Sequence, residues 1–330
     1  MSFTTSTAVF TYPAATKPGL KLVGKRYVPA RPAPGGPTLV FTHCTGSHKE
    51  VWEPVIGSLF DHDPPSIREA WAFDWQSHGE AGVLNDALLK DDGACGLSVR
   101  EWAAGLQTAL ASRDFSGHRL VGIGHSSGAT AILLSTISSD AGKGVPYEAI
   151  VLVEPSLITR AVFNAHLAER ERALKFMHKA ITARRDTWGS REEALLDFKT
   201  RLPWKIWHPR VLSLLVKHGI KDVSAEDGTA VALACSKIQE RTAYAESEPY
   251  FVAVEWLGVL DPATPVHCIF GDRYDLVPKY AHDSVLEVRK MASVQTVPRA
   301  GHSVVQENPD GVAASMRQSI STMAAASSKL

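Results

Sequence analysis

The most reactive pattern in the chain is the pentapeptide GHSSG at residues 124–128, which matches G-x-S-x-G. An apolar run of strand type precedes it, and a helix-type segment follows it. This is the strand–turn–helix setting in which such a serine acts as a nucleophile. The two glycines relieve crowding in the sharp turn that exposes the hydroxyl. We therefore predict that Ser126 attacks an ester or thioester carbonyl.

A serine hydroxyl needs a neighbouring base to accept its proton. The chain has 13 histidines, and His302 follows its last strand-like segment, residues 294–297. In folds that carry this nucleophile turn, the base follows the last strand, and the chain order is serine, acid, histidine. Gly301 would let the loop turn tightly beside the serine. We predict His302 as the general base.

The imidazole requires a carboxylate that holds its tautomer, and two residues fit the chain order. Glu154 ends the apolar run 149–153 and precedes a proline. Asp275 follows the next strand-like run, one residue later than the usual position, which Tyr274 occupies here. We favour Glu154. Asp275 stays as the alternative, because only the geometry of the folded chain decides between the two carboxylates.

The loop at residues 41–46 lies between a strand-like run and a helix-like segment. A loop in this position supplies a second backbone N–H for the developing oxyanion, beside that of the residue after the nucleophile. We predict the amides of Thr45 and Ser127 as the two donors, with Cys44 as the alternative to Thr45. We expect His43 to anchor the loop by hydrogen bonding.

The elements that position these residues alternate between strand-like and helix-like segments. This alternation predicts an α/β fold with a mostly parallel, eight-stranded sheet. The expected strands are residues 9–12, 20–28, 38–42, 70–73, 118–123, 149–153, 266–270 and 294–297. The expected helices between them are residues 52–60, 99–111, 127–137, 279–290 and 310–323.

Residues 157–262 break this alternation and contain no convincing strand. Apolar residues recur along residues 163–181 at the spacing of one helix face. Ser190 to Glu193 reads as a capping box that opens another helix. We predict a helical cap at 157–262, inserted into a core formed by 1–156 and 263–330.

The composition bounds the function classes. The 330 residues carry no net charge and 45% are hydrophobic, which fits a globular protein without the basic field of a nucleic-acid binder. No apolar run reaches the ~18 residues of a membrane span. The four cysteines are widely spaced, so we expect neither a metal site nor a disulfide framework, and no cofactor.

The predicted cap carries an excess of positive charge. Residues 157–221 contain 14 Lys or Arg and 6 Asp or Glu. A basic lid would attract an anionic, phosphate-bearing substrate. Four cap residues are candidate substrate contacts: Arg184, Arg185, Lys205 and Trp188.

The chain ends in Ser328-Lys329-Leu330. A terminal S-K-L is an import address that the peroxisomal receptor reads. We predict this receptor as a partner and the peroxisomal matrix as the location.

Together these motifs resemble the α/β-hydrolase superfamily across the whole chain. Residues 43–54, 184–194 and 207–211 and the terminal tripeptide show a narrower likeness. They resemble fungal peroxisomal hydrolases of toxin and secondary-metabolite pathways, such as the AK-toxin group and the mycophenolic-acid-pathway acyl-CoA hydrolase. Members of that group tend to read HANG where residues 43–46 read HCTG. In the mycophenolic-pathway enzyme the acid follows the strand that corresponds to the one before Glu154.

The resemblance implies a serine hydrolase that acts on an acyl-CoA thioester or another small-molecule acyl ester. Two alternatives use the same residues: transfer of the acyl group to a nucleophile other than water, as in an acyltransferase or cyclase, and hydrolysis of a C–C bond. A third is a non-catalytic ligand-binding protein on a hydrolase scaffold.

Overall fold

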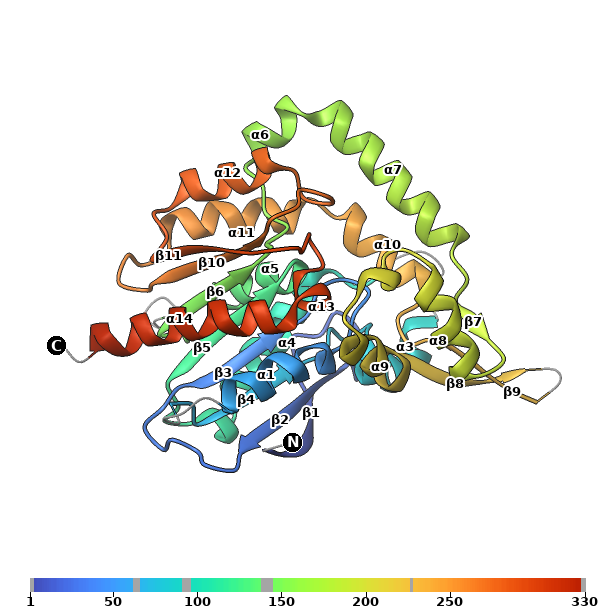
Figure 1. The fold of residues 1–330 in the computed structure, drawn as a ribbon, viewed down its shortest axis with the longest axis horizontal. Helices are drawn as coiled ribbons and strands as arrows, with labels where there is room; N and C mark the ends of the chain where they lie inside the picture. Colours follow the sequence, from blue (N-terminus) through green and yellow to red (C-terminus); the bar gives the residue numbers. More distant parts are fainter. Residues whose placement is uncertain (1–2, 62–65, 91–95, 138–144, 226–227, 328–330) are drawn as a thin grey trace.

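The centre of the molecule is an eight-stranded sheet (Figure 1). The computed structural model describes residues 3–61, 66–90, 96–137, 145–225 and 228–327. The two strands at one edge, Phe3–Thr11 and Lys21–Pro29, pair antiparallel, and the other six strands of this sheet run parallel to one another. The predicted fold class is therefore confirmed. In spatial order the strands are β1 (Phe3–Thr11), β2 (Lys21–Pro29), β4 (Glu69–Phe73), β3 (Thr38–Thr42), β5 (Leu120–His125), β6 (Ala149–Val153), β10 (Val266–Gly271) and β11 (Ser293–Val297).

Helices cover both faces of this sheet, which explains why its central strands are continuous apolar runs. Every residue of β3, β5, β6 and β10 is buried, as expected for parallel strands with two covered faces. One face packs against α4 (Val99–Leu110), α5 (Ser127–Ser135), α11 (Glu248–Val259) and α12 (Lys279–Val288). The other packs against α1 (Glu53–Phe60) and α14 (Pro309–Ser327).

This topology gathers chain segments that are distant in the sequence. Because β3, β5, β6, β10 and β11 are parallel, the residues that follow each of them emerge at one edge of the sheet. Such an edge is where ligands bind in open α/β sheets. Short elements complete the core: η1 (Lys49–Trp52), α2 (Gly79–Leu84), α3 (Asp86–Lys90), η2 (Arg113–Phe115) and α13 (Val304–Glu307).

Residues 157–262 differ from the expectation of an all-helical segment. Their helices are α6 (Arg160–Ala165), α7 (Leu167–Ala183), α8 (Arg191–Thr200), η3 (Trp204–Ile206), α9 (Pro209–His218), α10 (Lys237–Ala245) and α11. They also contain a three-stranded sheet of β7 (Thr187–Trp188), β9 (Gly228–Leu233) and β8 (Ile220–Ala225). The expectation of no strand is therefore wrong. The dipeptide Asp227-Gly228 is of a type common in hairpin turns, but the residues that flank it are mostly small or polar instead of alternately hydrophobic, so the signal is weak.

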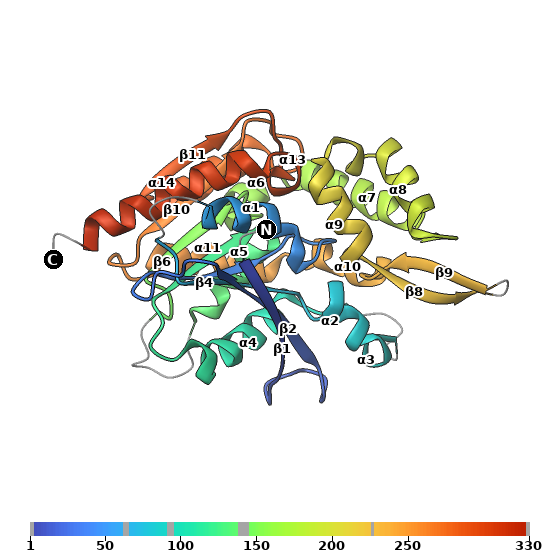
Figure 2. The ribbon, with the colours of Figure 1, turned by 60° about the horizontal axis from the view of Figure 1, so that its bottom comes forward.

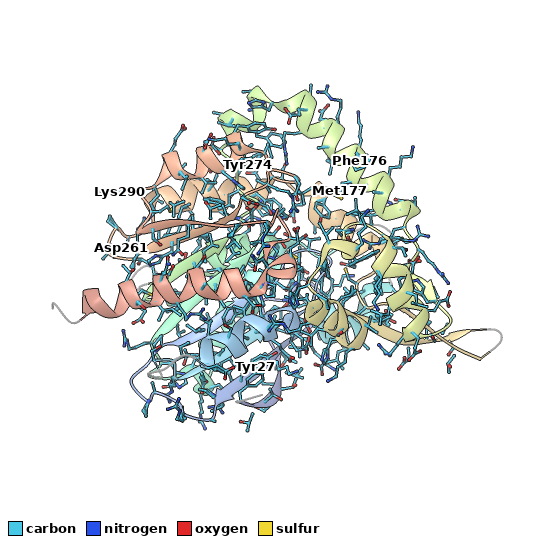
Figure 3. The ribbon with its side chains drawn as sticks, in the orientation of Figure 1. Tyr27, Phe176, Met177, Asp261, Tyr274 and Lys290 are labelled. Atoms are coloured by element: carbon cyan, nitrogen blue, oxygen red, sulfur yellow. The ribbon has the colours of Figure 1, made fainter. Side chains whose placement is uncertain are left out.

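Half of the predicted capping box is present: α8 begins at Arg191, and the Ser190 side chain accepts a hydrogen bond from the Glu193 N–H. The Glu193 carboxylate accepts from the Gly189 N–H at 2.7 Å instead of from the Ser190 N–H. Figures 1 and 2 both show α8, α9 and the β8–β9 hairpin extending away from the main sheet. Helix α7 is lightly packed, and Phe176, labelled in Figure 3, is 72% exposed. That this block acts as a cap domain stays a prediction.

None of the described helices has the length and apolar character that a membrane crossing requires.

Candidate active site

The turn between β5 and α5 holds Ser126 in a strained conformation. Its φ is 56° and its ψ is −119°, in the left-handed half of the map that non-glycine residues avoid. The two motif glycines make room for this turn. A Cβ on Gly124 would lie 2.4 Å from the Ala129 nitrogen, and one on Gly128 would lie 2.6 Å from the His43 oxygen. The observed strain at Ser126 is of the kind that surrounding structure maintains at functional sites.

Ser126 and His302 lie 176 positions apart in the sequence and meet at the sheet edge. The Ser126 Oγ lies 2.8 Å from Nε2 of His302. Both residues are largely buried, with 5% and 6% of their surface exposed. His125, one residue before the serine, supports the histidine loop through a 2.7 Å contact between its Nε2 and the His302 carbonyl oxygen.

Glu154 lies on the other side of the His302 ring. Its Oε2 is 3.2 Å from Nδ1 of His302, and its Oε1 accepts a hydrogen bond from the Gly271 N–H at 2.6 Å. Burial works to raise the pKa of this carboxyl, but the adjacent imidazoles of His282 and His302 outweigh it and lower the pKa to about 2. Glu154 is therefore ionised at neutral pH and can hold the His302 ring.

These contacts determine the direction of each hydrogen bond. An ionised Glu154 accepts from Nδ1–H of His302, which leaves Nε2 with a lone pair. The Ser126 hydroxyl then donates to Nε2, so that its oxygen can only accept from Ser156, whose Oγ lies 2.6 Å away. Ser156 therefore donates to the oxygen of Ser126. Ser156 is not among the predicted site residues, although it follows the Glu154-Pro155 step directly.

Asp275, the alternative acid, contacts the backbone of His302 instead of its ring. Its Oδ1 accepts from the His302 N–H at 2.8 Å and from the Leu276 N–H at 2.7 Å. Its other oxygen pairs with Arg273 at 3.2 Å. A Cβ on Gly301 would meet this carboxylate at 1.8 Å, which explains the glycine beside the histidine.

A second histidine contacts Glu154 and was not foreseen. Nε2 of His282, on α12, lies 3.3 Å from the same Oε2 that His302 contacts. Its ring stacks on Phe270 with centroids 4.3 Å apart. The sequence places His282 one turn inside a helix, where nothing distinguishes it from a surface residue.

The two expected oxyanion segments are adjacent. Oγ1 of Thr45 donates to Oγ of Ser127 at 3.0 Å. Ser127 opens α5, so its amide is one of the N–H groups that a helix leaves without an internal acceptor. Cys44 lies further back, where its sulfur accepts from Gln306 at 3.0 Å and burial raises the pKa of the thiol to about 11.

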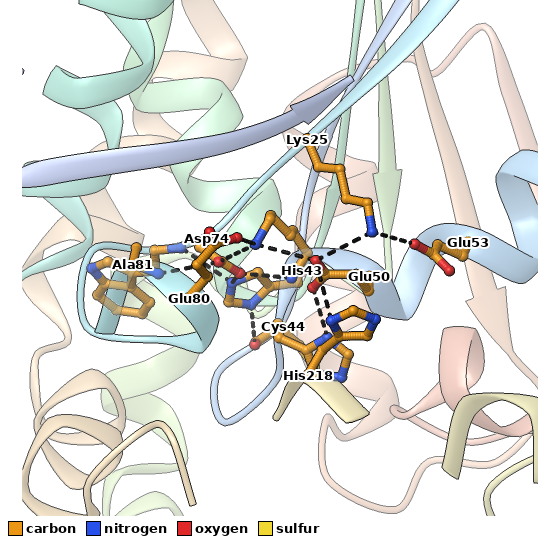
Figure 4. Close-up of polar contacts among 12 residues, drawn as sticks. Lys25, His43, Cys44, Glu50, Glu53, Asp74, Glu80, Ala81 and His218 are labelled. Carbon is orange, nitrogen blue, oxygen red and sulfur yellow. Dashed lines mark hydrogen bonds and ion pairs between the residues drawn. The ribbon is translucent and has the colours of Figure 1, made fainter. Parts of the chain in front are cut away.

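A buried polar network supports this loop (Figure 4). Nδ1 of His43 contacts the Cys44 carbonyl oxygen at 2.8 Å, while Nε2 accepts from the Trp75 N–H at 3.1 Å. Behind it, Lys49 and Asp74 are fully buried and form an ion pair at 2.9 Å. The expected anchoring role of His43 agrees with these contacts.

A cavity of about 130 Å³ opens onto Ser126. Polar groups and an apolar, partly aromatic wall share its lining. The lining residues are Thr45, Ser126, Ser156, Ile158, Phe163, Arg170, Ala243, Tyr244, Glu246, Ser247, Tyr250, Phe251, Leu276, Val277 and His302. In the part of the chain that the structure describes, no cluster of His, Cys, Asp or Glu could hold a metal ion.

The four predicted substrate contacts do not line this cavity, so that expectation finds no support in the structure. Arg184 pairs with Glu240, and Arg185 pairs with Glu193 at 2.6 Å. Trp188 is buried in a separate apolar cluster, and Lys205 is exposed. Long cap side chains can pair with each other or face the cavity, and residue type does not distinguish these outcomes. The predicted import tripeptide, Ser328, Lys329 and Leu330, lies outside the described residues.

Comparison with known proteins places this geometry in a family. Residues 39–315 match the model of the alpha/beta hydrolase family. The peroxisomal alpha-beta-hydrolase Lpx1 of Saccharomyces cerevisiae superposes with a TM-score of 0.76 at 18% identity, covering 98% of this chain and 90% of that one. A search of curated protein sequences gives no significant match.

Two further structures share the fold at low identity. The thioesterase domain of the curacin biosynthetic pathway has a TM-score of 0.64 at 13% identity, covering 94% of this chain and 98% of that one. An esterase of M. tuberculosis has a TM-score of 0.61 at 19% identity, covering 96% of this chain and 92% of that one. At these identities the likeness shows the shared fold.

Proposed function

Because the chain belongs to the alpha/beta hydrolase family, we propose that it is a serine hydrolase that cleaves an acyl thioester or ester through an acyl-enzyme on Ser126. The observation that carries the proposal is the hydrogen-bonded series Ser126–His302–Glu154, with contacts of 2.8 and 3.2 Å. A hydroxyl, an imidazole and an ionised carboxylate in this order are the groups that acyl transfer requires.

In the acylation step, Nε2 of His302 takes the Ser126 proton while Oγ attacks the substrate carbonyl carbon. Glu154 stabilises the imidazolium that results. The amides of Thr45 and Ser127 hold the oxyanion, a contribution worth about 3 kcal/mol per donor. The tetrahedral intermediate then collapses, the bond to the leaving group breaks, and His302 returns the proton to that group. The product is an ester on Ser126.

In the deacylation step, a water molecule attacks the acyl-enzyme carbonyl. His302 removes a proton from the water and then donates it to Oγ of Ser126, which leaves as the free hydroxyl. The carboxylic acid departs and the resting enzyme is restored. The same histidine thus acts once as base and once as acid in each half of the cycle.

The substrate that we propose is an acyl-CoA in the peroxisomal matrix. Three observations support it: the terminal Ser-Lys-Leu sequence, the basic excess of residues 157–221, and the resemblance of the motifs to fungal peroxisomal acyl-CoA hydrolases. A peroxisomal yeast hydrolase is also among the proteins that share the fold.

The test compares a panel of acyl-CoAs with simple esters of the same acyl chain lengths. Release of free CoA is followed with a thiol reagent, and Ser126→Ala serves as the blank. We expect the acyl-CoA to have the higher kcat/KM in at least one matched pair. Faster turnover of the simple ester at every chain length would reject the acyl-CoA substrate and leave the serine hydrolase chemistry in place.

A further inference from the structure

Arg170 is the cationic residue in the lining of the cavity at Ser126. It lies in α7, and its Nε is buried without a hydrogen-bond partner. A buried donor without an acceptor costs free energy unless another group satisfies it. The guanidinium group of Arg170 therefore keeps unused hydrogen-bonding capacity in a residue that lines the cavity.

The position of Arg170 on its helix is unusual. Residues at spacings of 4, 7 and 11 from it are Leu174, Met177 and Ile181, which are partly or fully buried. Arg170 therefore occupies the inward apolar stripe of α7, where a helix normally carries an aliphatic side chain. Phe176, labelled in Figure 3 beside Met177, is 72% exposed instead. The helix thus directs a charged side chain inward and an aromatic one outward.

Other arginines of this region already have ionic partners. Six of them form ion pairs with carboxylates: Arg160, Arg184, Arg185, Arg191, Arg201 and Arg210. Arg170 forms none with the residues that the structure describes. Its neighbour Arg172 is exposed to solvent, which satisfies its charge. The charge of Arg170 thus lacks a compensating carboxylate.

The polar groups around Arg170 do not supply a negative charge that pairs with it. The Tyr280 hydroxyl interacts with Arg170, but it is neutral and donates to Glu169 at 3.1 Å. Glu246, the carboxylate in the cavity lining, forms no ion pair with Arg170 and accepts from the Ser98 hydroxyl at 2.8 Å. A planar guanidinium in this setting matches a carboxylate or a phosphate, which it can bind through two parallel hydrogen bonds.

We propose that Arg170 binds an anionic group of the substrate, a carboxylate or a phosphate, while the scissile carbonyl lies at Ser126. The proposal rests on the proposed function, because it assumes that this cavity receives the acyl substrate. Arg170 then selects substrates that carry a negative charge over neutral ones of the same shape. The anion belongs either to the acyl part or to the leaving group, and the experiment separates these two sources.

Two matched substrate pairs distinguish the sources of the anion. The first is the mono-4-nitrophenyl ester of glutaric acid and its neutral methyl ester, which differ in a carboxylate on the acyl part. The second is butyryl-CoA and butyryl-N-acetylcysteamine, which differ in the phosphates of the leaving group. The variants are Arg170→Gln, Arg170→Lys and, as the matched control on the exposed side of α7, Arg172→Gln.

We expect Arg170→Gln to raise KM for the anionic member of one pair by roughly 10- to 100-fold, with its neutral partner unchanged. Arg170→Lys should recover part of the loss, since it keeps the charge without the planar fork. Arg172→Gln should behave like the wild type. The pair that responds identifies the source of the anion. Equal changes for both members of both pairs, or no change at all, would overturn the proposal.

Binding provides a readout that does not depend on turnover. In a Ser126→Ala background, calorimetry gives the Kd of each substrate with and without Arg170→Gln. A preference for the anionic member that disappears with Arg170→Gln supports the proposal even if the wild type hydrolyses nothing, and that failure would reject the proposed function alone. Equal Kd values for the charged and neutral members would reject the role of Arg170, whatever the activity.

Discussion

At the scale of single residues, the two candidate acids have different tasks. Glu154 contacts the ring of His302 at Nδ1, whereas Asp275 accepts from its backbone N–H. A ring contact acts on the tautomer and charge of the imidazole, while a backbone contact acts on the shape of the loop. The residues alone left this choice open, because both carboxylates follow strands that end at the same edge.

The two substitutions Glu154→Gln and Asp275→Asn separate these tasks. We expect Glu154→Gln to lower kcat by roughly 10³- to 10⁴-fold, because an amide no longer holds the productive tautomer. Asp275→Asn retains an acceptor for the backbone and should cost less than about tenfold. Steady-state kinetics on one ester substrate makes the comparison. The opposite ranking would transfer the role of acid to Asp275.

Ser156 gives a second prediction at this scale. Its hydroxyl donates to Oγ of Ser126 in the resting enzyme, so Ser156→Ala removes one hydrogen bond from the nucleophile. A neutral hydrogen bond contributes about 1 kcal/mol, which corresponds to roughly a fivefold change in rate. We expect Ser156→Ala to lower kcat/KM by about this factor. Ser156→Thr, which keeps a hydroxyl, should recover the wild-type kcat/KM. Equal effects of the two variants would contradict a role of the Ser156 hydroxyl as a donor to Ser126.

At the scale of elements, the central strands of the main sheet were predictable because both of their faces are buried, whereas the largely exposed edge strand β1 lies at Phe3–Thr11 instead of the predicted 9–12. Continuous apolar runs such as 38–42 and 149–153 correspond to β3 and β6 residue for residue. The β8–β9 hairpin was missed because its strands consist largely of small or polar residues and pair only within their own three-stranded sheet. The ionic partners of Arg184 and Arg185 depend on tertiary distances that no local pattern contains.

The loop after β3 depends on the element beneath it. Lys49 of η1 is fully buried with Asp74, and its amine also contacts Glu80 at 2.8 Å. Burial opposes the charge, but Asp74 and Glu50 raise the pKa of Lys49 above its usual value. Lys49→Met leaves Asp74 buried without its partner.

We therefore expect Lys49→Met to lower the free energy of unfolding by about 3 to 5 kcal/mol, measured by urea denaturation. The control is Lys90→Met, whose exposed pair with Asp86 contributes less than about 1 kcal/mol. If the two variants had equal stability, the buried pair would have no special role in holding the loop.

At the scale of the whole molecule, buried histidines couple folding to pH. Burial lowers the pKa values of His78 and His125 to about 3 each. In the unfolded chain these groups titrate near 6.5. Their contribution to stability is therefore complete above about pH 6.5 and is lost as the pH falls toward 3, because the unfolded state then binds more protons.

We expect the free energy of unfolding to decrease from pH 6.5 to 4.5 by about 2 to 3 kcal/mol for each of these histidines. His78→Gln keeps an acceptor for the Gly46 N–H, which lies 3.0 Å from Nε2, but does not titrate. Its stability should therefore decrease less steeply with acid than that of the wild type. Denaturation curves at stepped pH measure both slopes, and parallel curves would contradict the assignment.

Hydrolysis through an acyl-enzyme, as proposed, depends on one covalent event at the hydroxyl of Ser126. A fluorophosphonate probe reacts with a serine that a neighbouring base activates, and mass spectrometry of the digested protein locates the adduct. We predict a single adduct on the peptide that contains Ser126, absent in Ser126→Ala and strongly slowed in His302→Ala. A folded wild-type protein that remains unmodified, or that carries the adduct on another residue, would contradict the account.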